Sequence, residues 1–125
     1  DATAGTVWEW LIPTVFMVLL VPALPLFAHA EERIFRTGAE GWSPARRAFK
    51  VVQFGLVHAV IGIPIGAALA LSVGGAYFMA VYLRAYRRSG SRHDATMEST
   101  TAHTVYNGMI IGVFIIAIVV TEVVG

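Results

Sequence analysis

AHAEERIFR, residues 28–36, stands at the end of an apolar run that begins near Val7, and it carries two adjacent carboxylates and two arginines. An ionised carboxylate is costly at membrane depth, so such residues are rare there and mark a functional site by default. Two later apolar runs are also interrupted by polar residues, one at His58 and the other at His103 with Asn107. We therefore expect these three places to meet in one site inside a membrane domain.

The composition indicates that a membrane is the solvent of this chain. Hydrophobic residues make up 57% of its 125 residues and charged residues 14%, and the mean hydropathy is +0.70. A soluble domain of this length cannot bury so much apolar surface. The absence of cysteine excludes thiolate metal sites and a cysteine nucleophile. The net charge of +1 gives no argument for nucleic acid, so we expect membrane lipid, not nucleic acid, as a partner.

The apolar runs predict an all-α, polytopic bundle of about four transmembrane helices, which forms a single integral membrane domain over residues 1–125. Pro22 and Pro25 predict a break in the first run, because proline removes a backbone donor and kinks a helix. We expect the last helix to start near residues 95–99, with Asp94, Ser99 or Thr100 as its cap. The runs cover residues 7–28, 51–61, 65–83 and about 95–124.

Basic residues gather in two clusters, over residues 33–50 and 84–92. By the positive-inside rule both clusters belong on the cytoplasmic side of the membrane. The chain must then cross twice between them, and the glycine and proline of residues 62–64 predict the turn on the far side. Both termini are expected outside.

Small residues four positions apart predict where helices approach closely, because side chains without bulk let two backbones come together. The pairs are Gly62 with Gly66, Gly66 with Ala70, and Gly108 with Gly112. Helix packing explains these positions better than a catalytic role does.

Helical spacing decides which of the polar residues can cooperate. Glu32 and Arg36 lie four positions apart and can pair on one face, while Glu31 points about 100° away. His58 and His103, like Glu31, lie within about a dozen residues of a basic cluster, which puts all three in the same half of the bilayer. A carboxylate and a histidine that share a water can act as general base and acid. A second histidine with an asparagine amide can stabilise an oxyanion, as in a peptidase that activates water.

Two other interpretations of the histidines stay open. A glutamate and two histidines form a known zinc ligand set, although the spacing is neither His-Glu-x-x-His nor His-x-x-Glu-His. His29, His58 or His103 could also be the axial ligand of a tetrapyrrole. Because a lone histidine in a helix is more often a hydrogen-bonded packing residue, we assign neither a metal nor another cofactor.

The same residues resemble the motifs of the CAAX protease and bacteriocin-processing family (CPBP, or Abi) of intramembrane glutamate proteases. Residues 31–36 are similar to its E-E-x-x-x-R motif, residues 54–58 to its F-x-x-x-H motif, and residues 103–107 to its H-x-x-x-N motif. The order and approximate spacing of the motifs are also similar, and the resemblance covers residues from about 28 to 112.

The resemblance implies a metal-independent intramembrane endopeptidase. By analogy, Glu31 activates the attacking water together with His58, while His103 and Asn107 form the oxyanion hole. The substrate would be a membrane protein, and the enzyme would lie in a bacterial inner (plasma) membrane with its basic loops in the cytoplasm. Supporting residues would be Glu32, Arg36 and Phe54.

A second hypothesis is a non-proteolytic accessory subunit of a larger membrane protein complex that retains the same fold. Family members usually carry several membrane helices before the first motif, whereas this sequence has one apolar run there. Faces rich in small residues also suit contacts with helices of another chain. The three intact motifs favour the enzyme.

Overall fold

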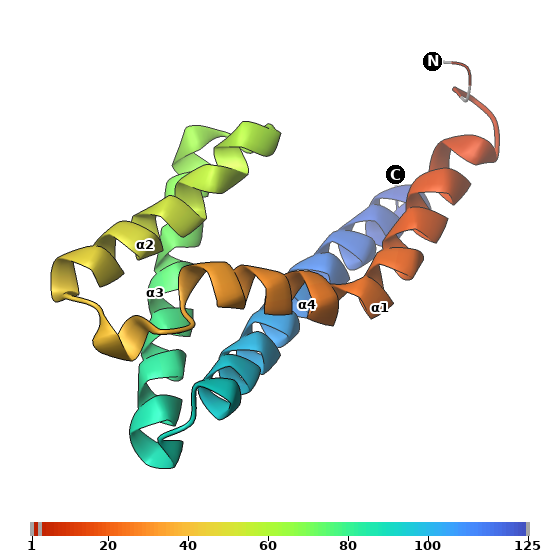
Figure 1. The fold of residues 1–125 in the computed structure, drawn as a ribbon. Coiled ribbons are helices and arrows are strands. Elements are labelled where there is room, and N and C mark those ends of the chain that lie inside the picture. Colours follow the sequence, from red (N-terminus) through yellow and green to blue (C-terminus); the bar gives the residue numbers. More distant parts are fainter. Residues whose placement is uncertain (1, 3, 125) are drawn as a thin grey trace.

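The computed structural model describes residues 2 and 4–124, and all regular structure within them is helical (Figure 1). Helices α1, α3 and α4 are long and apolar enough to cross a membrane, which confirms the predicted all-α membrane bundle. Helix α2 has 14 residues, or about 21 Å at 1.5 Å per residue, and is shorter than the roughly 30 Å of hydrocarbon in a bilayer. The elements in order are α1 (Trp8–Phe35), η1 (Ala39–Gly41), α2 (Pro44–Val57), η2 (His58–Ile61), α3 (Ile65–Ser89) and α4 (Arg92–Val124).

Helices α2 and α3 form a hairpin and lie side by side (Figure 1). The Ser43 hydroxyl oxygen caps α2 by accepting a hydrogen bond from the Arg46 N–H at 3.2 Å, and Pro44 takes the first helical position. The hairpin turns at Gly62, whose φ of +95° favours glycine. Pro64 then precedes the first residue of α3. The predicted turn at residues 62–64 is confirmed.

Two glycines allow the close packing of the hairpin. A Cβ on Gly55 would lie 2.1 Å from the Ser72 hydroxyl oxygen, and one on Gly75 would lie 2.8 Å from the Phe54 ring. The four-residue spacing of small residues did not predict these contacts, because it identifies a helix face of small residues but not the residues that pack against it. The glycines that it selected border open space, since a Cβ on any of them would have no atom of the described chain within 4 Å: Gly62, Gly66, Gly108 and Gly112.

The predicted break at Pro22 and Pro25 is wrong. Helix α1 is continuous from Trp8 to Phe35 and contains all three prolines of the first run. Figure 1 shows that α1 bends in its middle instead, as expected where prolines remove backbone hydrogen bonds. Its first half runs beside the last half of α4, and the bend directs its second half across the bundle toward the α2–α3 hairpin (Figure 1).

Helix α4 begins at Arg92, earlier than predicted, because Ser91 supplies its cap. The Ser91 hydroxyl oxygen accepts a hydrogen bond from the Asp94 N–H at 3.1 Å. Ser99 and Thr100, two of the predicted caps, are buried within the helix instead.

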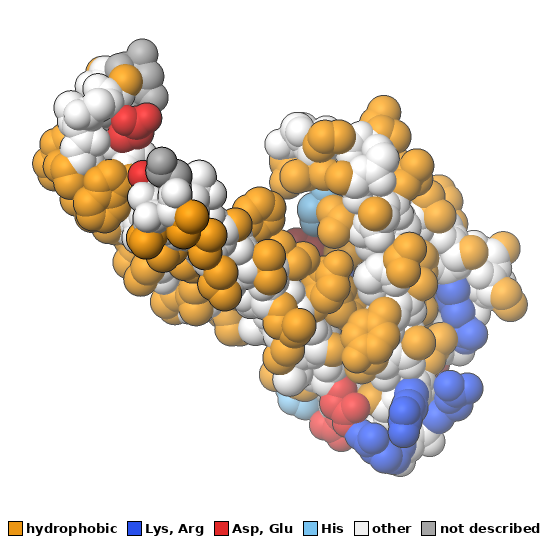
Figure 2. Space-filling model, turned by 180° about the vertical axis from the view of Figure 1, so that it is seen from behind, with side chains coloured by type: hydrophobic (Ala, Val, Ile, Leu, Met, Phe, Trp, Pro, Cys, Tyr) orange, Lys and Arg blue, Asp and Glu red, His pale blue; other side chains and the backbone are white. Residues whose placement is uncertain are grey.

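The basic residues collect at one end of the molecule. Figure 2 shows lysine and arginine side chains gathered at one end, which in Figure 1 is the end where α2 begins and α3 ends, while the chain termini and the α2–α3 turn lie toward the other end. The two basic clusters therefore share one end, as the predicted topology requires.

Candidate functional site

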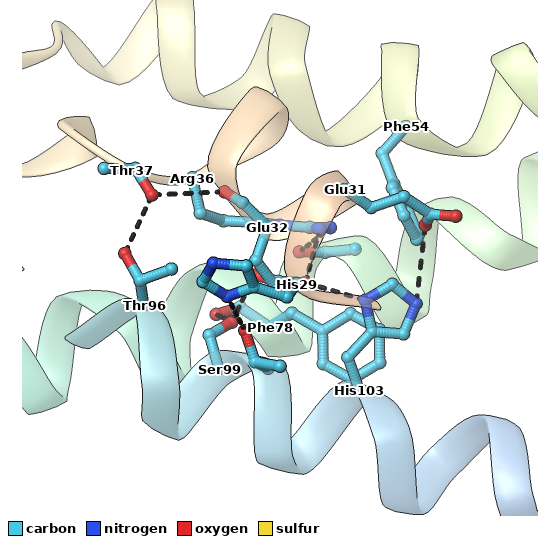
Figure 3. A network of polar contacts seen from close by, with 12 residues as sticks. His29, Glu31, Glu32, Arg36, Thr37, Phe54, Phe78, Thr96, Ser99 and His103 are labelled. Atoms are coloured by element: carbon cyan, nitrogen blue, oxygen red, sulfur yellow. Dashed lines mark hydrogen bonds and ion pairs between the residues drawn. The ribbon is translucent and has the colours of Figure 1, made fainter. Parts of the chain in front are cut away.

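The centre of the site is Glu32, whose side chain is completely buried between α1 and α4 (Figure 3). Its Oε1 accepts hydrogen bonds from Arg36 Nη1 and from His103 Nδ1, both at 2.8 Å, and its Oε2 accepts one from the Ser99 hydroxyl. The expected pairing of Glu32 with Arg36 is confirmed. An ionised carboxylate only accepts, so Nδ1 of His103 carries a proton. The buried charge of Glu32 is thus fully compensated.

Arg36 is 1% exposed and lies among aromatic rings. Its guanidinium carbon is 4.1 Å from the ring centroid of Phe54, 5.4 Å from that of Phe78 and 5.9 Å from that of Phe35. Its Nη2 also donates to the Gly75 carbonyl at 3.4 Å. Cation–π attraction and this hydrogen bond connect α1 to both arms of the hairpin. Arg36 therefore holds the Glu32 carboxylate in one position.

His103 connects the two adjacent carboxylates. Its ring is buried, stacks on Phe78 with centroids 4.5 Å apart, and meets the Phe54 ring edge-on at 5.5 Å. Its Nε2 lies 3.5 Å from Oε2 of Glu31. The Glu31 side chain is 33% exposed, yet this Oε2 is itself buried and has no hydrogen-bond partner among the described residues. The site therefore contains an unsatisfied carboxylate oxygen next to a histidine that Glu32 orients.

His58 lies at the junction of α2 and η2 and is half-buried. Its Nδ1 is 2.8 Å from the Phe54 carbonyl oxygen, and because a carbonyl only accepts, Nδ1 carries a proton; the neutral form of the ring then has its lone pair on Nε2. The His58 and Phe54 rings meet edge-on at 5.2 Å. Phe54 thus touches both imidazoles, and no hydrogen bond in the described part of the chain joins His58 to Glu31.

Asn107 lies one turn beyond His103 on α4 and is half-buried. Its side chain makes no hydrogen bond within residues 2 and 4–124. The structure therefore brings the residues of the first motif together with Phe54 and His103 and holds His58 at the Phe54 ring. It leaves the Asn107 side chain without a hydrogen bond to any described residue.

Two residues of the site were missed from the sequence. Ser99 is completely buried, donates to Glu32, and has its hydroxyl oxygen 3.1 Å from the Phe78 carbonyl oxygen. It lies four positions before His103 on the same helix face, and this spacing could have identified it. Phe78 sits in an apolar run that gives no such signal.

The surroundings of the site are open on one side. Figure 2 shows a hollow between the arm formed by the outer parts of α1 and α4 and the α2–α3 hairpin, with an acidic and a histidine side chain at its floor.

No three histidine, aspartate or glutamate side chains of the described residues form a group that could hold a metal ion, so Glu31, His58 and His103 do not assemble into the zinc set considered above.

Comparisons of the chain with protein-family models, with curated proteins and with solved structures find no match.

Proposed function

We propose that the chain is an intramembrane endopeptidase of the CPBP kind, which hydrolyses a membrane protein with a water activated by Glu31. The observation that carries this proposal is the difference between two adjacent carboxylates. Glu32 is paired with Arg36 and accepts further hydrogen bonds, whereas the buried Oε2 of Glu31 accepts no hydrogen bond from any described residue and lies 3.5 Å from His103 Nε2. A general base must be free to accept a proton, and Glu31 meets this condition while Glu32 does not.

In the proposed reaction, Glu31 removes a proton from water as the water oxygen attacks the carbonyl carbon of the peptide bond. The electrons of the C=O double bond move to its oxygen to give an oxyanion. They then re-form the double bond as the C–N bond breaks, its electrons leave with the nitrogen, and Glu31 returns the proton to the leaving amine. The lone pair on His58 Nε2 suits it to bind a hydrogen of the same water. His103, when its Nε2 is protonated, and the Asn107 amide would donate to the oxyanion.

The position of the site supports a substrate within the membrane. The hollow beside it lies between helices whose outer surfaces are apolar (Figure 2). A membrane-embedded segment could therefore reach Glu31 from the side without passing through water. The basic ends of the hairpin would face the cytoplasm, in the inner membrane of a bacterium.

The experiment compares peptide termini in membranes that contain the wild-type protein, E31Q or E122Q at matched protein levels. Glu122 is an exposed carboxylate near the far end of α4, so E122Q makes the same chemical change outside the site. We expect a new peptide terminus, produced by cleavage, in membranes with the wild-type protein or E122Q. Its amount should be at least ~100-fold lower with E31Q, the lower range for loss of a general base. Equal amounts of this terminus with E31Q and wild type would contradict the proposal.

One observation favours the accessory subunit as a second candidate. The apolar windows of α1 and α4 are only 11% and 0% buried within the chain. Such faces bind lipid or the helices of a partner. If no terminus depends on Glu31 and the chain is purified with a stoichiometric partner, the polar cluster serves packing or partner binding instead of catalysis.

A further inference from the structure

A second polar pocket lies on the other side of α1 from Glu31. It has a volume of about 280 Å³ and is formed by the end of α1, the turn after it and the start of α4. Successive helical residues point about 100° apart, so Arg33 points about 200° from Glu31 and the two sites are separate. Every lining side chain carries a hydrogen-bond donor and none is a carboxylate. These residues are His29, Arg33, Thr37, Arg92, His93 and Thr96.

The positive charge of the pocket is incompletely neutralised. Arg33 is exposed and has no ion-pair partner among the residues that the structure describes. Arg92 is paired with Glu40, whose other oxygen accepts a hydrogen bond from the Tyr82 hydroxyl at 2.8 Å. Glu40 therefore positions Arg92 at the pocket, and its single charge offsets only one of the two guanidinium groups. His93 lies in the first turn of α4, where the helix dipole adds partial positive charge.

Hydrogen bonds from α1 and from the turn after it to α4 hold the walls of the pocket in place. The hydroxyl oxygens of Thr37 and Thr96 are 2.8 Å apart, and His29 Nδ1 lies 3.4 Å from the Thr100 hydroxyl oxygen. The Thr37 hydroxyl also donates to the Glu32 carbonyl oxygen at 3.5 Å, so the Thr96 hydroxyl donates to that of Thr37. These contacts fix the positions of His29, Thr37 and Thr96 before any ligand binds.

The pocket also lies where a lipid headgroup would be. It is at the start of α4, next to the end of α3 where arginine side chains gather (Figure 2). Leu26 lies one turn before His29 on the same face of α1 and is 73% exposed. An acyl chain could therefore continue from the pocket along an apolar helix surface, which a free anion would not use.

We propose that this pocket binds the phosphate group of an anionic membrane lipid. A phosphodiester carries one negative charge and accepts several hydrogen bonds at once, and guanidinium groups recognise it with paired donors. The proposal does not depend on the peptidase activity, because it uses a different face of α1 and none of the residues assigned to that reaction.

The test measures binding of short-chain lipids to the full chain in detergent. The ligands are dihexanoyl phosphatidylglycerol, the phosphatidylcholine with the same acyl chains, and inorganic phosphate. The variants are R33Q, which removes the unpaired charge, and R87Q, which removes an exposed arginine near the end of α3 and outside the pocket. Because Arg33 is exposed, R33Q is expected to fold as the wild type does.

We expect phosphatidylglycerol to bind at least about tenfold more tightly than either other ligand, and R33Q to weaken its binding by roughly tenfold, the loss of a charge-assisted contact. R87Q should change the affinity by less than about twofold, since Arg87 does not line the pocket and its exposed charge is screened by solvent and salt. Equal binding of the two lipids, or equal effects of R33Q and R87Q, would overturn the proposal. If inorganic phosphate binds as tightly as phosphatidylglycerol, the proposal that the bound phosphate group belongs to a lipid is wrong.

Discussion

Loss of the buried ion pair between Glu32 and Arg36 should destabilise this fold more than any surface change. Removing one partner of a buried pair costs about 3–5 kcal/mol, because the other charge stays buried without compensation. E32Q does this with little change of shape and leaves Arg36, which is 1% exposed, among aromatic rings. It also weakens the hydrogen bonds that Glu32 accepts from His103 and Ser99. We expect E32Q to lower the free energy of unfolding by at least ~3 kcal/mol.

The double variant E32Q/R36M separates the cost of an orphaned charge from the loss of contacts. It removes both charges, and the methionine can fill the space among the aromatic rings. Replacing both members of a buried ion pair by uncharged groups often changes the free energy of unfolding little. The loss of stability in the double variant should therefore be at least about 2 kcal/mol smaller than the summed losses of the single variants E32Q and R36M.

The assay is unfolding of the detergent-solubilised protein by sodium dodecyl sulfate, followed through the helical circular dichroism signal. E98Q is the matched control, because Glu98 pairs with Arg88 at the surface, where the two side chains are 44% and 62% exposed. Such a pair contributes at most about 1 kcal/mol. An E32Q variant as stable as E98Q, or a double variant whose loss equals the sum of the single losses, would refute the reasoning.

Two further predictions use the same unfolding assay. G55A should lower the free energy of unfolding by roughly 1–3 kcal/mol, because its Cβ would lie 2.1 Å from the Ser72 hydroxyl oxygen. G112A, whose Cβ would have no atom of the described chain within 4 Å, should be neutral or stabilising by up to about 1 kcal/mol, and equal effects of the two changes would contradict the close α2–α3 contact. Y82F removes a hydroxyl that donates to Glu40 at 2.8 Å and accepts from the Gly38 N–H at 2.9 Å. It should cost about 1–3 kcal/mol and speed hydrogen exchange at the Gly38 amide, whereas unchanged protection of that amide would argue against the contact.

The helices could be predicted because each one depends on residues that are close together in the sequence. Apolar runs of sufficient length mark α1, α3 and α4, and Gly62 with Pro64 ends one arm of the hairpin and starts the next. The path of α1 could not be predicted in the same way. Pro22 and Pro25 each remove a hydrogen bond, but whether the helix breaks or bends depends on the α4 surface that it packs against.

The contacts of the site could also be predicted only in part. Four-residue spacing predicted the pairing of Glu32 with Arg36, because both residues lie on one helix. The partner of His103 depends on the rotation of α4 against α1, which no spacing within either helix encodes. Similar depth in the membrane was therefore enough to expect His103 near Glu31, but not to predict that Glu32 accepts its Nδ1–H.

Of the two adjacent glutamates in the site, Glu32 is completely buried and ion-paired while Glu31 is partly exposed, and His103 contacts both. Two consecutive residues of a helix point about 100° apart, so Glu32 reaches the buried Arg36 while Glu31 reaches the edge of the site. The two nitrogens of one ring contact both carboxylates, at 2.8 Å and 3.5 Å. Glu32 therefore fixes the direction in which His103 presents Nε2 to Glu31. If Glu31 is the base, E31Q should abolish cleavage in a protein of nearly wild-type stability, whereas E32Q should lower stability and cleavage together.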